Sequence, residues 1–324
     1  MTAPDATPAI AGSPRGARLG RLAFVLLAPA LLAEVGSGNT SLAAFADAHA
    51  VLFLTIAYGV PLLVVAELRT RLRLSSLAVF LLGLAYGLFN EGLLAQTLVR
   101  AEGVPISAFD HYMVAAGFNW SWAALILPWH ALFSVSFPLA LADAAFPAAA
   151  GAPLLPRSTD AAVGIVLAAG IVLLAAGRQP EPQMALCAAA IAVLLLAAVA
   201  LREPAAAPPP RRRAAQAAFA FVAYPAVVVA SAALGAANVQ PPLYVLWCLA
   251  AAAGLVLIAR RLGATLLSAP LTACGAYAAL GVFHAVGSLS KGALAEAAVG
   301  VVFALAFVAA AVGALRRRVA VTPA

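Results

Sequence analysis

Basic residues and long apolar segments alternate along this chain, and the alternation limits the fold more than any other feature. Sixteen of the nineteen Lys and Arg residues fall in every second gap between about ten apolar segments. The other gaps hold only Arg100, Arg178 and Lys291. Because short basic loops stay on the cytoplasmic side of a membrane, the pattern predicts a polytopic membrane protein with an even number of spans. It also predicts that both termini are cytoplasmic.

The composition excludes a soluble globular fold. The chain is 65% hydrophobic and 10% charged, which leaves too little polar surface to cover a soluble protein of 324 residues. The formal net charge of +7 collects at the ends of apolar segments, so it indicates topology and contact with anionic lipid. We therefore expect the lipid bilayer as a partner and no nucleic acid. Heavy use of Ala, Leu and Arg is typical of GC-rich bacteria, so we expect a bacterial plasma membrane.

Helices are the default spanning element because lipid offers backbone groups no hydrogen-bond partners. We predict an all-α transmembrane bundle of about ten spans, each of about 20 residues. The predicted helices cover residues 20–37, 46–67, 74–98, 119–142, 159–177, 184–201, 215–236, 242–259, 264–286 and 292–315. Arg15, Arg18 and Arg21, followed by an apolar run to Ala33, also fit a signal peptide, whose cleavage would remove the first span.

A Pro-rich stretch divides the predicted bundle. Residues 203–213 hold four prolines and end in three arginines, a composition typical of a linker. The predicted organisation is a cytoplasmic tail at 1–19, membrane helices with a polar site at 20–201, a cytoplasmic loop at 202–214, further membrane helices at 215–315 and a cytoplasmic tail at 316–324. No internal repeat is evident, so symmetry does not support an inverted-repeat transporter.

Ionisable residues at membrane depth mark candidate functional positions, because each costs several kcal/mol unless it is paired or hydrated. Six of them lie in the predicted helices: Glu34, His49, Glu91, His130, His284 and Glu296. With the predicted orientation they fall toward the outer side of the bilayer, and His130 lies near mid-depth. We therefore predict a polar site in the outer half of the membrane. The alternative for Glu34, His49 and Glu296 is a hydrated or snorkelling side chain at the interface.

In the helix predicted at 74–98, the carboxylate of Glu91 lies on a face that is suited to close helix contact. Gly83 and Gly87 are spaced as in a GxxxG motif, and Asn90 and Glu91 follow on the same face. The next predicted helix carries a matching stripe, made of Asn119, Trp122, Ile126, His130 and Ser134. Glu91 and His130 lie at similar depths on sequential helices, so we predict a hydrogen bond or ion pair between them.

Two interpretations of this stripe stay open. The Glu91–His130 contact is either a clasp that sets helix register or part of a functional site. Stability alone is a weak explanation for a Glu and a His at membrane depth, since interhelical hydrogen bonds in membranes average under about 1 kcal/mol. Asn119 and Trp122 are either substrate contacts or an interfacial anchor. The candidate substrate-binding residues are Glu34, His49, Asn119, Trp122, Ser134 and Glu296.

The motifs Gly83-Leu-Ala-Tyr-Gly-Leu-Phe-Asn-Glu91 and Trp129-His130-Ala-Leu-Phe-Ser134 carry a family resemblance. Residues 83–138 resemble the superfamily of the CAAX prenyl endopeptidase and the bacteriocin-processing membrane proteases, which includes the gamma-secretase scaffold subunit. The resemblance implies that Glu91 acts as general base on a water, with His130 holding that water or the developing oxyanion. His284 loosely matches a further motif histidine.

The chain departs from that family's pattern at several positions. Asn90 stands in place of a second glutamate, Ala95 in place of the usual arginine, and Ser288 in place of the asparagine four residues after the last histidine. The catalytic candidates are therefore Glu91 and His130, with weaker support for Asn90 and His284.

No metal or cofactor is expected. Cys187, Cys248 and Cys274 lie singly inside apolar segments and are interpreted as buried structural thiols. The chain has no HExxH motif, nucleotide-binding loop or haem signature.

Three functions remain open from the sequence. The first is a membrane-embedded hydrolase of the protease type, or a degenerate relative that binds a membrane protein or peptide without cutting it. The second is a proton-coupled transporter or channel for a small solute, in which Glu34, Glu91, His130 and Glu296 line an aqueous path. The third is a membrane scaffold. The cytoplasmic half of the predicted bundle looks free of ionisable side chains, and this counts against transport.

Overall fold

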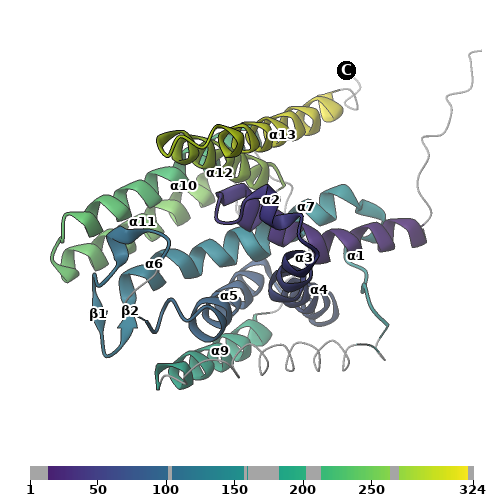
Figure 1. The fold of residues 1–324 in the computed structure, drawn as a ribbon. Coiled ribbons are helices and arrows are strands. Elements are labelled where there is room, and N and C mark those ends of the chain that lie inside the picture. The colour runs from purple at the N-terminus through teal and green to yellow at the C-terminus, as the bar shows by residue number, and fades with distance from the viewer. Residues whose placement is uncertain are drawn as a thin grey trace, which may run out of the picture.

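The chain folds as a bundle of helices, which confirms the all-α prediction (Figure 1). The computed structural model describes residues 14–100, 104–156, 159, 182–201, 213–262 and 270–319. Within these ranges eight helical segments are long and apolar enough to cross a membrane, and the shorter apolar helix Pro241–Leu255 adds to them. The helix predicted at 159–177, apart from its first residue, and nearly all of the predicted loop at 202–214 lie outside the described residues.

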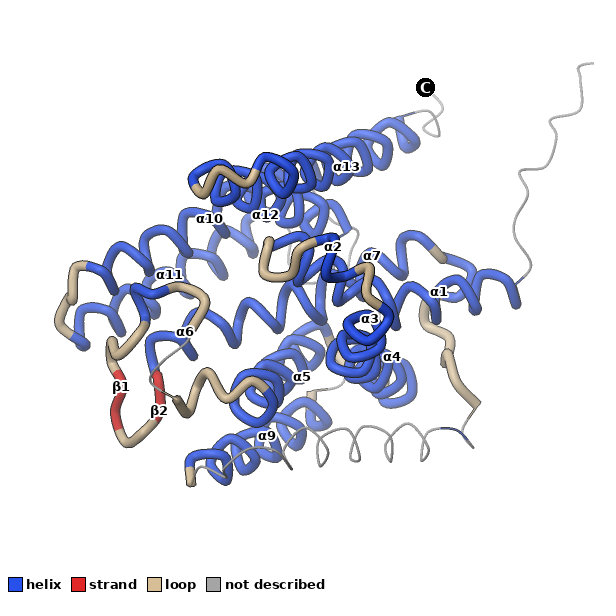
Figure 2. The backbone as a smooth tube through the Cα atoms, viewed as in Figure 1, coloured by secondary structure: helices blue, strands red, loops and turns tan. Residues whose placement is uncertain are grey.

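Helix dominates the described chain in Figure 2. The first group is α1 (Pro14–Ala30), η1 (Leu31–Val35), α2 (Leu42–Phe45), α3 (Ala48–Leu54), η2 (Thr55–Gly59), α4 (Val60–Leu72), α5 (Ser76–Gly87) and η3 (Leu88–Leu94). The second is η4 (Ser107–Phe109), β1 (Val114–Ala115), β2 (Phe118–Asn119), α6 (Trp120–Trp129), η5 (His130–Ser136), α7 (Phe137–Ala145) and η6 (Pro147–Ala149). The third is α9 (Gln183–Ala200), α10 (Arg213–Ala236), α11 (Pro241–Leu262), α12 (Pro270–Ser290) and α13 (Leu294–Val319).

The bundle has two ends that differ in charge. The basic end carries Arg21 of α1, with Arg69 and Arg71 of α4. The loop end carries residues 36–47, 95–100 and 104–119, which lie between helices on the opposite side. The start of α1 and the end of α13 lie on one side of the bundle, away from the β1–β2 ribbon (Figure 1).

Burial is uneven across the bundle. The core is built from α1, α4, α5, the α6–η5–α7 helix and α12, and α12 is the most enclosed span. By contrast α9, α10 and α13 turn most of their side chains outward, and Leu196 and Val302 are 73% and 66% exposed. An apolar side chain that faces out from a membrane bundle contacts lipid. The polar residues described below therefore lie among helices that other helices surround.

Glycines allow two of these helix pairs to touch through their backbones. A Cβ atom added at Gly59 would lie 2.0 Å from the carbonyl oxygen of Leu26, so η2 and α1 are in backbone contact. A Cβ atom at Gly83 would lie 2.5 Å from Cα of Ala131, which brings α5 onto η5. The predicted close contact of the GxxxG face is thereby confirmed.

Several predicted helix boundaries are wrong: the helix predicted at 46–67 runs to Leu72, the one predicted to end at 286 runs to Ser290, and two further shifts change the contacts of polar residues. The helix predicted to end at residue 98 ends at Leu94, because Gln96 takes a left-handed backbone conformation with φ of 63°. The next helix starts at Trp120 and runs to Ala145 instead of residue 142. The early end at Leu94 allows a contact of Thr97, and the later end at Ala145 allows a contact of Asp143. Hydropathy alone indicates neither contact.

A small hairpin covers the loop end. Strands β1 and β2 pair antiparallel, with Val114 opposite Asn119 and Ala115 opposite Phe118. The two turn residues, Ala116 and Gly117, both have positive φ, as a type I′ turn requires. The hairpin delivers the chain to α6, whose first turn is capped by the Asn119 side chain. In the same loop, burial raises the pKa of the Tyr112 phenol, which donates to the carbonyl of Val239.

We predict that Gly59→Ala destabilises the protein by about 2 kcal/mol or more, because the added methyl group forces α1 away from η2. Gly287→Ala is the matched control, since it adds the same methyl group to a helix at a position with nothing within 4 Å. Thermal unfolding in detergent measures both. Equal melting temperatures for the two variants would contradict the close approach.

Candidate functional site

Glu91 and His130 are in direct contact at the centre of the buried polar region. Nε2 of His130 lies 2.9 Å from Oε1 of Glu91, and the side chains are 1% and 12% exposed. Glu91 comes from η3, in the last turn before the loop end, and His130 is the first residue of η5. The predicted contact is therefore confirmed. The catalytic role assigned to the two residues stays a prediction.

Neighbouring side chains complete the hydrogen bonding of both groups. Oε2 of Glu91 accepts from the hydroxyl of Thr97 and, at 3.5 Å, from the indole N–H of Trp122. Trp122 also donates to Thr97 at 3.1 Å. On the other side of the imidazole, Nδ1 of His130 lies 3.0 Å from Oγ of Ser134. Trp122 and Ser134 were predicted from their helical stripe, whereas Thr97 was missed because it follows the end of the helix.

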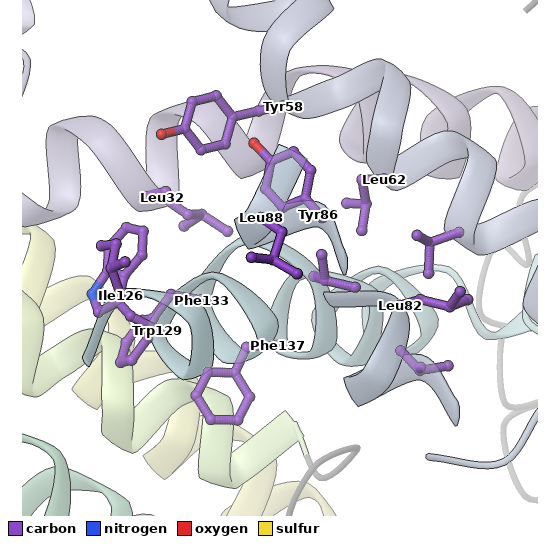
Figure 3. Close-up of a cluster of buried hydrophobic side chains, with 14 of the residues drawn as sticks. Leu32, Tyr58, Leu62, Leu82, Tyr86, Leu88, Ile126, Trp129, Phe133 and Phe137 are labelled. Atoms are coloured by element: carbon purple, nitrogen blue, oxygen red, sulfur yellow. The ribbon is translucent and has the colours of Figure 1, made fainter. Parts of the chain in front are cut away.

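Two tyrosines pack around the imidazole. The rings of Tyr58 and Tyr86 lie 6.2 Å and 5.3 Å from the ring of His130, measured between centroids. Figure 3 shows both tyrosines on the same side of the helix that carries Phe133 and Phe137. The hydroxyl of Tyr86 accepts from Asn90 at 2.8 Å, so Asn90 orients an aromatic wall and does not contact the Glu91–His130 pair.

A second carboxylate reaches the same aromatic wall from η1. Glu34 accepts hydrogen bonds from the hydroxyls of Tyr58 and of Thr40, the latter at 2.9 Å. Its side chain is partly buried near the loop end. We call the set of Glu34, Tyr58, Tyr86, Glu91, Thr97, Trp122, His130 and Ser134 the acid–base cluster.

π-Helical segments carry the main members of this cluster. Glu34 lies in η1, Tyr58 in η2, Glu91 in η3 and His130 in η5. The segments are neighbours, since η1 and α1 pack on η5, and α1 packs on η2. A π-helical turn widens the helix, changes the direction of its side chains and is frequent at functional sites. Each of the four π-helical segments around the imidazole of His130 therefore carries a polar residue of the cluster.

Prolines explain part of this backbone geometry. Pro61 follows η2 and has no N–H to donate to the carbonyl of Ala57, which instead accepts from Tyr86 at 3.0 Å. Pro138 follows η5 and removes the N–H that would serve the carbonyl of Ser134, and the adjacent carbonyl of Phe133 accepts from the hydroxyl of Tyr277. Tyrosine hydroxyls from other helices thus bind backbone carbonyls beside both prolines.

The cluster has the electrostatic character of an acid–base centre. It contains two carboxylates and one imidazole, and its hydrogen bonds involve no Lys or Arg side chain among the described residues. Its hydroxyl groups can each donate or accept. No group of three His, Cys, Asp or Glu side chains in the described part of the chain is arranged to hold a metal ion.

Several predicted site residues lie elsewhere. The His49 side chain is 96% exposed and lies 3.8 Å from Asp47, so it does not join the cluster. His284 is buried in α12, with Nε2 3.6 Å from Oε2 of Glu296 of α13. Asn119 caps α6 and holds Ser121, which agrees with its interpretation as a structural residue.

Sequence reasoning also missed an ion-pair network at the basic end. Asp143 of α7 binds Arg21 of α1 at 2.8 Å and Arg69 of α4 at 2.7 Å. Arg21 is only 1% exposed. The expectation that the basic half of the bundle is free of buried ionisable side chains is therefore wrong. The sequence indicates such a pairing for Glu67, which Arg69 and Arg71 follow closely, but not for Asp143, whose next arginine along the chain is Arg157.

The fold and the buried cluster define a polytopic helical membrane protein. A family model described as an uncharacterized membrane protein family matches residues 22–323, and the chain belongs to that family. No curated protein and no solved structure matches the chain. The comparisons thus establish a membrane protein without adding support to the resemblance to the CAAX prenyl endopeptidase superfamily.

We predict a coupling energy of about 1–2 kcal/mol between Glu91→Gln and His130→Ala in a double-mutant cycle of unfolding free energies. Each single change leaves a buried partner without its counterpart, so the double change costs less than the sum. Glu296→Gln paired with His130→Ala is the control and is expected to be additive. Additivity for Glu91 and His130 as well would contradict the contact.

Proposed function

We propose that the protein is a proton-coupled transporter of a small solute and that the Glu91–His130 pair is its proton-exchanging group. The observation that carries the proposal is the acid–base cluster itself, assembled on four π-helical segments. Ionisable residues inside membrane bundles are characteristic of proton relays, and interrupted helices line transport sites. The ion pairs of Asp143 with Arg21 and Arg69 also support transport, because ionisable groups then lie toward both ends of the bundle.

The surroundings of the pair suit either protonation state. When Glu91 is a carboxylate, Thr97 and Trp122 donate to it. Whether the shared proton resides on Glu91 or on Nε2 of His130, Nδ1 keeps its hydrogen and donates to the hydroxyl of Ser134; when the pair has lost that proton and Nδ1 is bare, the same hydroxyl donates to it. A proton therefore moves between Glu91 and His130 without leaving a buried group unpaired, which a transport cycle requires.

Glu34 is the second carboxylate of the proposed path. It lies closer to the loop end than His130 along the chain, and its Tyr58 partner packs directly against the imidazole. We infer that protons enter from the loop end through Glu34 and reach the Glu91–His130 pair after a rearrangement of Tyr58. In the predicted orientation the loop end faces the outside of a bacterial plasma membrane, and both termini are cytoplasmic.

A membrane-embedded hydrolase is the second candidate, and one observation favours it. Ser134, His130 and Glu91 form a line with distances of 3.0 Å and 2.9 Å, which matches the order of nucleophile, base and carboxylate. In the resemblance to membrane proteases, Glu91 would instead activate a water. Either chemistry would act on a membrane protein or peptide. The transporter is preferred because the cluster extends to Glu34 and Tyr58, which hydrolysis does not need.

The transport proposal predicts solute-dependent proton movement by the full chain in liposomes. A pH-sensitive dye inside the vesicles reports proton flux while amino acids, sugars, organic cations and organic anions are added in turn. Glu91→Gln is expected to reduce the flux at least about tenfold, because glutamine cannot exchange a proton. His49→Ala is the control, since His49 is exposed and outside the cluster. Equal flux in wild type and Glu91→Gln would contradict the proposal.

Ser134→Ala separates the two candidates. In a transporter the change removes an adjustable hydrogen bond, so we expect a partial loss of proton flux. In a serine-type hydrolase it removes the nucleophile, so cleavage of membrane peptides would fall by several orders of magnitude. Cleavage of a peptide by the wild type, lost in Ser134→Ala, would replace the transport proposal with the hydrolase.

A further inference from the structure

The ion-pair network at the basic end joins three helices and one connecting segment. Asp143 bridges Arg21 and Arg69, with one carboxylate oxygen directed to each arginine. Arg21 also donates to the carbonyl of Ala152 at 3.3 Å, and Arg18 donates to the carbonyl of Leu154 at 3.0 Å. The segment 151–155 is thereby held on α1.

A second carboxylate holds the same segment on α4. Glu67 accepts from the backbone N–H groups of Leu154 and Leu155 and is bound by Arg71 at 2.8 Å. Arg71 in turn donates to the carbonyl of Leu155 at 2.9 Å. Charge-assisted hydrogen bonds of this kind are about twice as strong as neutral ones. The basic end is therefore closed by contacts that depend mainly on Asp143 and Glu67.

Each of the three joined helices also carries part of the acid–base cluster. Arg21 shares a continuous helix with Glu34, Arg69 follows Tyr58 in the next, and Asp143 follows His130 in the third. In all three the cluster residue lies in a π-helical segment, and the arginine or aspartate lies in the α-helical part at the basic end. A change of bend at the π-helical segments would move the basic ends of these helices relative to one another.

We propose that the Asp143-centred network is a gate that closes the acid–base cluster from the basic end of the bundle. The inference rests on the proposed transport function, because a gate has a role only where a site must open to each side in turn. Opening requires Asp143 to release Arg21 and Arg69. Both arginines then keep partners, since Ala152 and the solvent or lipid headgroups at the membrane surface are at hand.

A buried serine provides a reporter for this opening. Ser136 lies in η5 between His130 and Asp143, and its hydroxyl is buried without a hydrogen-bond partner. Ser136→Cys is introduced into the full chain after Cys187, Cys248 and Cys274 are changed to Ala. A membrane-impermeant thiol reagent is then applied to either side of lipid vesicles that contain the protein, and the rate of labelling is measured.

Asp143→Asn is expected to raise the labelling rate from the basic end about tenfold, which is typical of coupling between two states. Arg69→Gln, which leaves the Arg21–Asp143 pair in place, is expected to raise it less. Arg73→Gln is the matched control, because Arg73 is an exposed arginine at the same end and outside the network. Its labelling rate is expected to stay at the wild-type value.

An unchanged rate in folded Asp143→Asn and Arg69→Gln would overturn the gate. So would an increase only from the loop end, or a failure of both variants to fold, since the network would then be a structural tie. Labelling does not depend on transported solute. A protein that moves no protons but opens at the basic end in Asp143→Asn would therefore retain the gating device while the transport function fails.

Discussion

The hydrogen bond between Glu91 and His130 is the interaction around which the rest of the structure is arranged. A carboxylate and an imidazole at membrane depth are costly unless every polar atom is satisfied. Here Thr97, Trp122 and Ser134 supply the remaining partners, and tyrosine rings exclude lipid from the imidazole. The outward-facing helices carry apolar side chains and keep this polar centre inside the bundle.

The backbone provides the geometry for this arrangement. Pro61 and Pro138 remove N–H donors beside the cluster, and the helices widen into π-helical segments there. The hydroxyl groups of Tyr86 and Tyr277 bind the nearby carbonyls of Ala57 and Phe133. Gly59 and Gly83 let the same helices approach until their backbones touch. Prolines and glycines weaken an isolated helix. In this bundle the neighbouring helices supply hydrogen bonds and packing contacts at these positions.

The sequence predicts the bundle and the central contact but not the surrounding network. Hydropathy and charge alternation indicate the helices, and the shared stripe of Gly83, Gly87 and Glu91 indicates which face meets His130. Thr97 escapes prediction because it contacts Glu91 only after the helix ends early at Leu94. Tyr58 lies in an apolar run where periodicity does not distinguish it. Asp143 and Arg21 fall at helix ends, where a charged residue ordinarily indicates exposure to water, and their pairing depends on three-dimensional proximity.

A proton-coupled transporter of this kind needs Glu91 to gain and lose a proton inside the membrane, whereas a structural clasp keeps Glu91 in one protonation state. Infrared difference spectroscopy of the full chain in lipid, recorded between about pH 5 and pH 8, measures this protonation. We expect a protonated-carboxyl band that changes with pH, shifts in Glu91→Asp and disappears in Glu91→Gln. A spectrum without a pH-dependent carboxyl band, or a band that persists unchanged in Glu91→Gln, would contradict it.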